Sequence, residues 1–305
     1  MGKKDIVDRP YFSDCRRFAE LMNEVLYHGE EILLPENLIL QKRKYPSLSS
    51  TCGEMERDVL MKDVGHNICY GIEIETESDY GMSERVMTYD TCEYEYQMRE
   101  IDREHREQKD YQSYQEKKSR MKKSDILFPT VTAVLYLGEG RWQGSRKLSQ
   151  MFHVPAELRK LLGVNLQEYS FPLIEADYMN PEEYRTDLKE FFQAMQCRRD
   201  RLKLERLFRT EAFQHLSPET ERTIARHLHV NRLVHKMEKE ELPMCKAFDE
   251  LMEEKRREGK REGRKEGKSE ERIRIIRKMV KEGLDEAFIR KMTRCTKDEI
   301  AIAGR

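Results

Sequence analysis

Apolar and polar residues alternate along residues 68–75, the most regular pattern in the chain. A strand has a side-chain period of two, so this segment is predicted to be a strand with isoleucines toward a core and Glu73 and Glu75 together on the opposite face. A second β-prone run, residues 59–61, precedes it, and residues 63–67 between the two runs contain turn-forming glycine and asparagine. The two runs are therefore expected to form a β-hairpin.

Other periodic segments predict helices and strands around this hairpin. A helix capped by Ser13 or Asp14 carries an apolar stripe between residues 18 and 26, which is suited to pack on a sheet. A long polar helix is expected from about residue 82 to 123. The near-continuous apolar run at 130–137 predicts a central strand covered on both faces.

The rest of the chain is predicted to be one edge strand followed by helices. Residues 165–178 indicate a strand that Pro172 restricts to a sheet edge. Trp142, the only tryptophan, is expected to anchor its loop, with a stacking role for substrate as the alternative. Helices are expected from 181 to 252, with these positions among the buried ones: Leu202, Leu207, Phe208 and Leu216. This order predicts an α/β fold with helices packed on the sheet.

Composition limits the class of protein. The 305 residues suffice for one sizeable α/β domain with helical extensions, and 38% of them are charged, with a mean hydropathy of -0.87. No apolar run has the length of a membrane helix or a signal peptide, so no membrane contact is expected. The seven cysteines show no paired spacing, which fits free thiols in a reducing cytoplasm. His227, His229 and His235 are interpreted as ordinary polar residues of a basic helix.

The candidate chemistry is a cluster of carboxylates. Asp58 lies directly before the first strand of the hairpin, so folding should bring it near Glu73 and Glu75. Carboxylate oxygens are the ligands that hard divalent cations such as Mg²⁺ prefer. The alternative is that Glu73 and Glu75 simply form the solvated face of a half-exposed strand.

The C-terminal region has a charge pattern of its own. Residues 73–110 are acidic and 255–281 are basic, although the net charge is only -1. Gly259, Gly263 and Gly267 recur every fourth residue, which would place them on one stripe of a helix. The stripe suggests close helix–helix contact in a homodimer, and a charged linker is the alternative. Two amphipathic segments follow, which could contact DNA or another protein.

Four segments in order and spacing resemble one protein family: RFAELMNEVLYHGEEILLPENL, RDVLMK, GIEIETESDYGMSERVMTYD and FPTVTAVLYLGEGRWQG. The chain resembles the Rpn family of recombination-promoting nucleases, also described as YhgA-like transposases, a branch of the PD-(D/E)XK nuclease superfamily. The resemblance covers about residues 5 to 190 and the C-terminal tail. It implies a PD-(D/E)XK core, with a mixed sheet flanked by helices and a helical C-terminal extension.

The resemblance also implies roles for individual residues. Asp58 and Glu73 correspond to the metal ligands, with Mg²⁺ or Mn²⁺ as cofactor, and Glu75 corresponds to a third catalytic position. The family has Gln at that third position and the wider superfamily has Lys, so Glu75 is a departure. An ionised carboxylate cannot donate a hydrogen bond, so Glu75 would act as general base or bind a second metal, or else mark lost chemistry.

Supporting residues and a DNA surface follow from the same resemblance. Glu20 is a weak candidate near the metal, and Arg85 or Gln97 would orient the scissile phosphate. DNA is a polyanion, so its approach to carboxylates needs basic surface. The candidates for phosphate contact are Arg141, Arg146 and Lys147, and secondarily Arg198, Arg199, Arg201, Lys203 and Arg206. For the second group a solvated helix face of mixed charge is an equal alternative.

Together these inferences predict a cytoplasmic, metal-dependent DNA endonuclease that hydrolyses phosphodiester bonds, with a role in recombination or transposition implied by the resemblance alone. The expected domains are a nuclease-like domain at 1–190, a helical region at 191–254, and a charged helix with a small helical module at 255–305. Two alternatives stay open. One is a catalytically weakened DNA-binding accessory of recombination, and the other is a helical interaction or oligomerisation protein.

Overall fold

The computed structural model describes residues 5–42, 44–46, 54–166, 168–228, 231–296 and 300. Contacts divide the chain into two compact units, Met1–Val234 and His235–Arg305. The expected helical region at 191–254 is divided between them, with residues 191–234 in the first unit and 235–254 in the second. None of the described helices is long and apolar enough to cross a bilayer.

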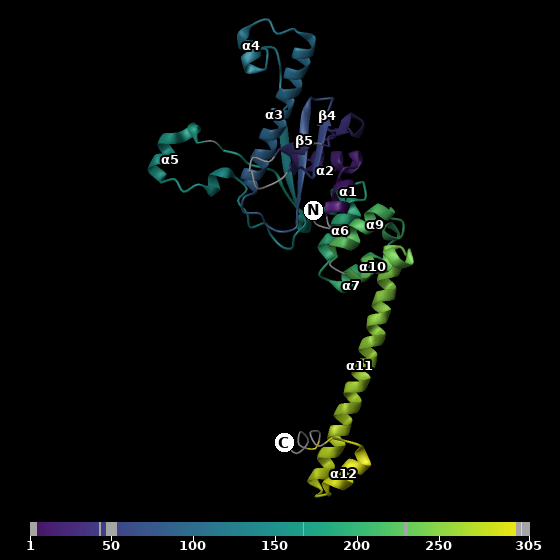
Figure 1. Cartoon of the computed structure of the whole chain (residues 1–305). Helices are drawn as coiled ribbons and strands as arrows, with labels where there is room; N and C mark the ends of the chain where they lie inside the picture. The colour runs from purple at the N-terminus through teal and green to yellow at the C-terminus, as the bar shows by residue number, and fades with distance from the viewer. Residues whose placement is uncertain are drawn as a thin grey trace. The chain divides into compact units, whose positions relative to one another are not determined.

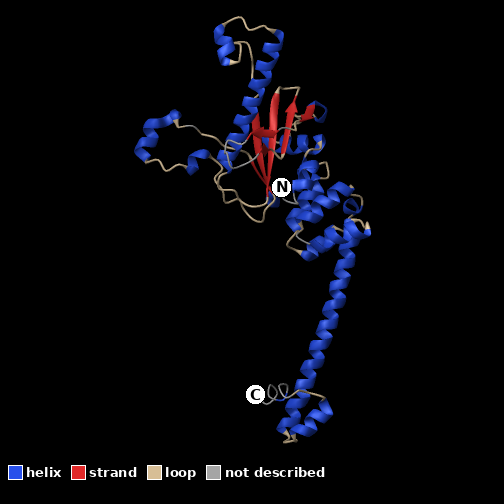
Figure 2. Cartoon of the chain, viewed as in Figure 1, coloured by secondary structure: helices blue, strands red, loops and turns tan. Residues whose placement is uncertain are grey.

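The first unit is built on a five-stranded mixed sheet, drawn in red in Figure 2. Its strands lie in the order β1 (Leu38–Leu40), β4 (Val59–Asp63), β5 (Ile68–Glu75), β6 (Thr130–Tyr136) and β7 (Leu173–Glu175). The pairs β1–β4 and β4–β5 are antiparallel, and β5–β6 and β6–β7 are parallel. Two further strands, β2 (Lys44–Pro46) and β3 (Glu54–Glu56), form a separate antiparallel pair. The predicted α/β class is therefore confirmed.

The predicted hairpin is present as β4 and β5. Asn67 adopts a left-handed φ of 58° in the turn, a conformation that asparagine tolerates better than most residues. The side chain of Asp63 accepts a hydrogen bond from the Gly65 N–H at 2.8 Å and lies 2.7 Å from Nδ1 of His66. This turn fixes the register, in which Val59 pairs with Ile72.

Helices cover both faces of the sheet. Helix α2 (Cys15–Tyr27) begins at the predicted cap Asp14, whose side chain accepts the N–H groups of Arg16 and Arg17. It covers the isoleucine side of β5, where the hydroxyls of Tyr27 and Tyr70 lie 2.6 Å apart. On the other side, α3 (Met82–Gln108) packs Met82 and Val86 against β6. The alternative of a solvated strand face is therefore wrong for Glu73, because α3 covers that face and Glu73 is only 2% exposed.

The long polar helix ends earlier than expected. At Lys109 the backbone turns left-handed, with φ of 54°, and a separate helix α4 (Tyr114–Ser119) follows. His105 holds this turn, because its two ring nitrogens lie 2.8 Å from Asp110 and 3.0 Å from Asp125. Because His105 contacts both carboxylates, the chain after α3 turns back along that helix toward β6. The single helix expected up to residue 123 is therefore interrupted after residue 108.

The connection from β6 to β7 makes an excursion from the sheet (Figure 1). Trp142 is the anchor that the sequence predicts, packed edge-on against Tyr136 and Phe171. The base of the excursion is closed by the Leu148 N–H, which donates to the Tyr169 carbonyl at 2.8 Å. Beyond it lie η2 (Leu148–Met151), α5 (Ala156–Leu162) and η3 (Gly163–Asn165), and α5 buries no residue. The expected strand in 165–178 is reduced to β7, at the edge as Pro172 predicts.

Helices complete the first unit. They are α1 (Asp5–Phe12), α6 (Leu188–Cys197), α7 (Arg201–Leu207), α8 (Glu211–Gln214) and α9 (Pro218–His227), with short turns η1 (Pro35–Asn37), η4 (Ala176–Tyr178) and η5 (Pro181–Glu183). Phe208 is buried as predicted, but Leu202 is 64% exposed. The cap at Asp200 starts α7 with Leu202 facing outward and turns Leu204 inward instead, at 4% exposed.

His227 also differs from its prediction as an ordinary polar residue of a basic helix. Its side chain is 1% exposed, and Nε2 lies 2.8 Å from Oδ1 of Asp8. Asp8 lies on α1, far away in the sequence, so local spacing gave no sign of this partner. His229 lies outside the described residues, and His235 is exposed on α10 (Asn231–Glu240).

The second unit is a helical hairpin. Its long helix α11 (Met244–Lys281) is followed by a turn at Gly283, with φ of 75°, and by α12 (Glu286–Thr293). The two helices enclose a small core of Ile276, Ile289 and Cys295. The two amphipathic segments that the sequence predicts are therefore present, as the end of α11 and as α12, and Gly283 divides them.

Candidate active site

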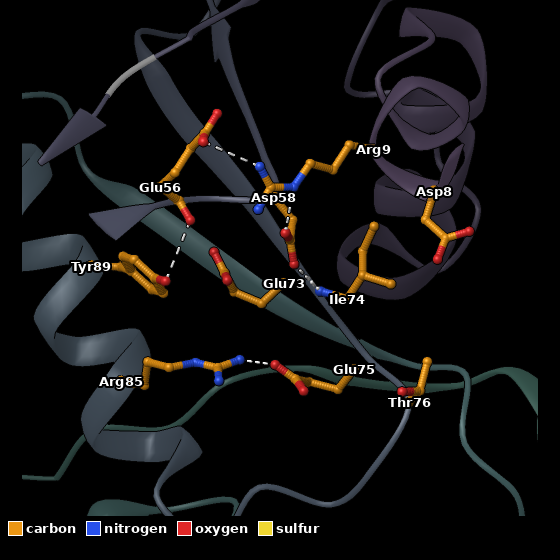
Figure 3. A pocket seen from close by; sticks show the side chains of 10 residues that line it. All are labelled: Asp8, Arg9, Glu56, Asp58, Glu73, Ile74, Glu75, Thr76, Arg85 and Tyr89. Carbon is orange, nitrogen blue, oxygen red and sulfur yellow. Dashed lines mark hydrogen bonds and ion pairs between the residues drawn. The ribbon is translucent and has the colours of Figure 1, made fainter. Parts of the chain in front are cut away.

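The end of strands β4 and β5 opens into a cavity of about 270 Å³ that is rich in charged side chains. Figure 3 shows its walls, which come from α1, β3, the β4–β5 hairpin and α3. The lining residues are Asp8, Arg9, Glu56, Asp58, Glu73, Ile74, Glu75, Thr76, Arg85 and Tyr89. The three carboxylates predicted from the hairpin therefore do line one cavity.

Asp58 is placed by the hairpin register. Val59 pairs with Ile72, so Asp58 lies one step further, across from Glu73. Its Oδ2 accepts the Ile74 N–H at 2.8 Å, and its Oδ1 accepts Nε of Arg9 at 2.8 Å (Figure 3). The first bond fixes the carboxylate to β5, and the second gives it a cationic partner from α1.

Glu73 is the most unusual side chain of the cavity. It is 2% exposed, and its Oε1 receives no hydrogen bond from any residue that the structure describes. Nε of Arg57 lies 3.6 Å from that oxygen, which is too long for a hydrogen bond. Burial, together with the negative charge of Asp58, raises the pKa of Glu73 to about 8. At neutral pH this carboxyl group is therefore largely protonated.

A buried ion-pair network lies behind Glu73. The guanidinium of Arg57 donates to Asp90 at 2.5 Å and also contacts the Thr132 hydroxyl. Asp90 in turn accepts hydrogen bonds from Thr132 and from the Tyr169 hydroxyl. Burial opposes the charge of Arg57, but the carboxylates of Asp90 and Glu73 outweigh it and raise the pKa of Arg57. Because Asp90 takes the close contact, Glu73 gains only part of this positive charge.

Glu75 is paired with Arg85 from α3 (Figure 3). The same guanidinium also donates to Asp79 at 2.9 Å, so Arg85 is shared between two carboxylates. Tyr89, one turn further along α3, donates its hydroxyl to the Glu56 carbonyl at 3.4 Å. Burial, with the nearby charge of Glu73, raises the pKa of Tyr89 to about 12. Its hydroxyl is therefore a permanent donor in this cavity.

Two of the predicted supporting residues lie elsewhere. Glu20 lines a different cavity, and its carboxylate accepts the Thr186 N–H at 3.1 Å, which fixes the segment before α6. Gln97 accepts the Phe128 N–H at 2.7 Å and donates to the Phe128 carbonyl at 3.2 Å. Both side chains hold backbone in place, and neither lines the carboxylate cavity. Arg85 does line it.

The predicted basic surface is only partly available. Arg141 pairs with Glu175 at 2.8 Å and stacks on Tyr178, while Arg146 and Lys147 are exposed. Arg198 cannot contact DNA as expected, because it is buried and donates to the carbonyls of Leu137 and Gly138 at 2.6 Å. Three others of that run are paired with carboxylates: Arg199 with Glu139 at 2.8 Å, Arg201 with Glu205 at 3.1 Å and Lys203 with Asp200 at 3.7 Å.

Sequence reasoning missed the contribution of α1. Arg9 pairs with Asp58 across 49 positions, and Asp8 beside it lines the cavity while bonding His227. No local pattern links residues 8 and 9 to the hairpin, so only tertiary structure reveals them. The structure also places Tyr89 in the cavity wall and Asp90 behind it.

The carboxylates of the cavity are of the type that binds a hard cation, but two of them are already paired with arginine side chains of the same chain. No group of three or more His, Cys, Asp or Glu side chains in the described part of the chain has a geometry ready to hold a metal ion. Asp58 and Glu75 face Arg9 and Arg85 instead. The Oε1 of buried Glu73, next to Asp58, has no hydrogen-bond partner in the described part of the chain and is the feature that a cation would satisfy. Asp58 and Glu73 are thus the residues that could hold one.

Comparisons with known proteins found no matching family model, no matching curated protein and no matching solved structure.

Proposed function

We propose that this chain is a metal-dependent DNA endonuclease of the PD-(D/E)XK type. The observation that carries the proposal is the position of Asp58 across from buried Glu73 on two adjacent strands, with one Glu73 oxygen that receives no hydrogen bond from the described residues. An unsatisfied buried oxygen costs free energy, and such costs concentrate at functional sites. The resemblance to recombination-promoting nucleases gives this acidic pair its assignment as metal ligands.

In this proposal Asp58 and Glu73 hold one Mg²⁺ or Mn²⁺ ion. Glu73 must first release its proton, and Arg9 must give up its contact with Asp58. When bound, the cation supplies a Lewis acid for the phosphoryl oxygens and a more acidic water. Ile74 keeps its N–H on Asp58 and so holds the ligand in place during binding.

Glu75 and Arg85 would work as a pair in the same reaction. Arrival of a phosphate gives Arg85 a new anionic partner, because a guanidinium binds phosphate oxygens through several donors at once. Release from Arg85 frees the Glu75 carboxylate to take a proton from the attacking water. Arg85 then orients the scissile phosphate while Glu75 acts as base.

The DNA backbone would reach this cavity past exposed cations. Arg146 and Lys147 are exposed at the base of the β6–β7 excursion and remain the candidates for phosphate contact. Arg141 would first have to leave Glu175. A role in recombination or transposition, and a homodimer through the C-terminal helices, belong to the same proposal. Two copies would supply one cavity for each strand of a duplex.

A second candidate is a DNA-binding accessory of recombination without turnover. The contact of Glu75 with Arg85 favours it, since a carboxylate neutralised by a guanidinium is a weak base. Both candidates predict DNA binding, and only the first predicts cleavage.

Cleavage of supercoiled plasmid tests the proposal. Wild-type protein, Asp58→Ala and Glu73→Ala would be compared in Mg²⁺, Mn²⁺ and EDTA, with Glu20→Ala as a carboxylate control from a different cavity. The proposal expects metal-dependent nicking that falls to the EDTA level in the first two variants and persists in the control. Wild type that binds plasmid in a mobility-shift assay but never cuts it would support the accessory instead. Cutting that survives both substitutions would refute the assignment of Asp58 and Glu73.

A further inference from the structure

Two buried groups of opposite charge lie next to the cavity without bonding to each other. Nε of Arg57 and Oε1 of Glu73 are 3.6 Å apart, and neither atom has a hydrogen-bond partner among the residues that the structure describes. Arg57 is 5% exposed and Glu73 is 2% exposed. A shift of less than about 1 Å would bring the two atoms within hydrogen-bond distance. Because buried polar groups almost always pair, we looked for the contacts that hold the guanidinium back.

Strand β5 leaves room for the guanidinium beside Glu73. Gly71 precedes Glu73 by two residues, so both positions lie on the same face of the strand. A Cβ added at Gly71 would lie 3.2 Å from Cζ of Arg57 and 2.9 Å from the hydroxyl oxygen of Thr132, which is its partner on β6. The glycine therefore lets the guanidinium lie directly on the sheet, close to Glu73.

Asp90 holds the guanidinium from helix α3. Its Oδ1 accepts Nη2 of Arg57 at 2.5 Å and the Thr132 hydroxyl at 2.6 Å. Its Oδ2 accepts the Tyr169 hydroxyl. Asp90 is 2% exposed, and these donors fix both of its oxygens. The carboxylate therefore cannot follow Arg57 toward Glu73, and Nη2 stays bonded to Asp90.

This arrangement decides what Glu73 can bind. A guanidinium bonded to Glu73 would occupy one of its oxygens through a charge-assisted hydrogen bond, and a metal ion would have to break that bond. While Asp90 keeps Arg57 away, Oε1 of Glu73 stays available. Asp90 also offsets the positive charge of Arg57, which would otherwise repel a cation at the neighbouring carboxylate.

We propose that Asp90 is a positioning residue, which keeps Glu73 open for a metal ion by holding Arg57 away from it. The inference rests on the proposed function, because that proposal names Asp58 and Glu73 as the metal ligands. Asp90 is not among the residues that line the cavity, so it acts through Arg57. Replacing a residue that orients a metal ligand typically lowers metal affinity about 10- to 100-fold.

Binding of Mn²⁺ to the full-length chain tests the inference, with the electron paramagnetic resonance signal of free Mn²⁺ as the measurement. Asp90→Asn should bind Mn²⁺ about 10- to 100-fold more weakly than wild type, because Arg57 then turns to Glu73 as its remaining carboxylate. Leu204→Ala is the matched control, since it removes a buried side chain of α7 and should destabilise the fold without changing the affinity. An Asp90→Asn variant with wild-type affinity would overturn the inference.

A double variant separates positioning from a merely structural role. Arg57→Gln combined with Asp90→Asn removes the guanidinium together with its partner, so Glu73 is open again and the affinity for Mn²⁺ should return toward that of wild type. If Asp90 only supported the fold, the double variant would bind no better than Asp90→Asn. Because it removes both charges of the pair, the double variant should fold even where Asp90→Asn does not. A folded double variant that fails to bind Mn²⁺ would overturn the inference.

A crystal structure of Asp90→Asn gives a measurement without metal. Nε of Arg57 should lie within about 3.2 Å of Oε1 of Glu73, and an unchanged separation would contradict the role of Asp90. The proposed function fails in a different way. Wild type that binds no Mn²⁺, or whose affinity persists in Asp58→Ala, would refute the metal site and the inference with it. Binding that is lost in Asp58→Ala but unchanged in Asp90→Asn would overturn only the positioning role.

Discussion

Replacing Glu73 by glutamine should make the protein more stable at high pH and remove part of its sensitivity to pH. The side chain is 2% exposed, and burial with the charge of Asp58 raises its pKa from the ordinary 4.5 to about 8. The folded chain therefore keeps this proton where the unfolded chain has lost it. Stability must fall as pH rises from about 4.5 to about 8 and then level off.

The size of the effect follows from the same two values. A difference of one pKa unit between the folded and the unfolded chain corresponds to about 1.36 kcal/mol of stability. The shift from 4.5 to about 8 therefore gives an upper bound of about 5 kcal/mol for the stability lost when Glu73 ionises. Glutamine has nearly the same shape and no charge, so Glu73→Gln avoids this penalty. For a unit of this size, 5 kcal/mol corresponds to about 10–20 °C in melting temperature.

Thermal unfolding of wild type and Glu73→Gln between pH 5 and 9 measures this difference. The two melting temperatures should be close at pH 5 and should diverge up to pH 8, with the variant higher. The exposed Glu77→Gln on the following loop is the matched control and should follow wild type. If the melting temperatures of wild type and Glu73→Gln changed in parallel with pH, the reasoning would be refuted, because Glu73 would then ionise with the ordinary pKa of a glutamate.

Three further outcomes follow from the structure. Asp90→Asn should cost about 3–5 kcal/mol in urea unfolding, because it leaves the buried charge of Arg57 without its closest partner; an unchanged urea midpoint would contradict that network. Leu204→Ala should cost about 2–5 kcal/mol, whereas Leu202→Ala on the same helix should change stability by less than about 0.5 kcal/mol. Mg²⁺ at a hundred times its Kd should stabilise wild type by about 2.7 kcal/mol in thermal unfolding. Asp58→Ala should lose that gain, and an equal gain in both proteins would place the metal elsewhere.

The hairpin could be predicted from sequence because its information is local. Alternation over residues 68–75 and the turn before it specify two adjacent strands, and their register brings Asp58 to Glu73. The burial of Glu73 could not be predicted, since a period of two shows only that two faces differ. Which face is covered depends on α3, whose amino-terminal residues Met82 and Val86 pack on the sheet from outside the strand.

The ion-pair partners of the site residues could not be predicted from the sequence for a different reason. Arg9 with Asp58 and Asp8 with His227 are separated by 49 and 219 positions, and nothing at either end marks the other. Arg198 shows the same limit, because a basic run looks identical whether its first guanidinium binds phosphate or two buried carbonyls. The sequence therefore shows which residues are charged, while the tertiary structure shows which of them already have partners within the protein.

The closed base of the β6–β7 excursion has a consequence for how this fold can change. Parallel neighbours must be joined by a crossover, so the sheet does not set the length of this connection. Its two ends are held together by Leu148 and Tyr169, and beyond them α5 buries no residue and leaves Leu161 80% exposed. New peptide inserted near Gly163 would lengthen a loop whose ends are already joined, at little entropic cost. This is the point at which a reporter domain can be grafted, and at which related chains can acquire or lose whole segments, without disturbing the carboxylate cavity.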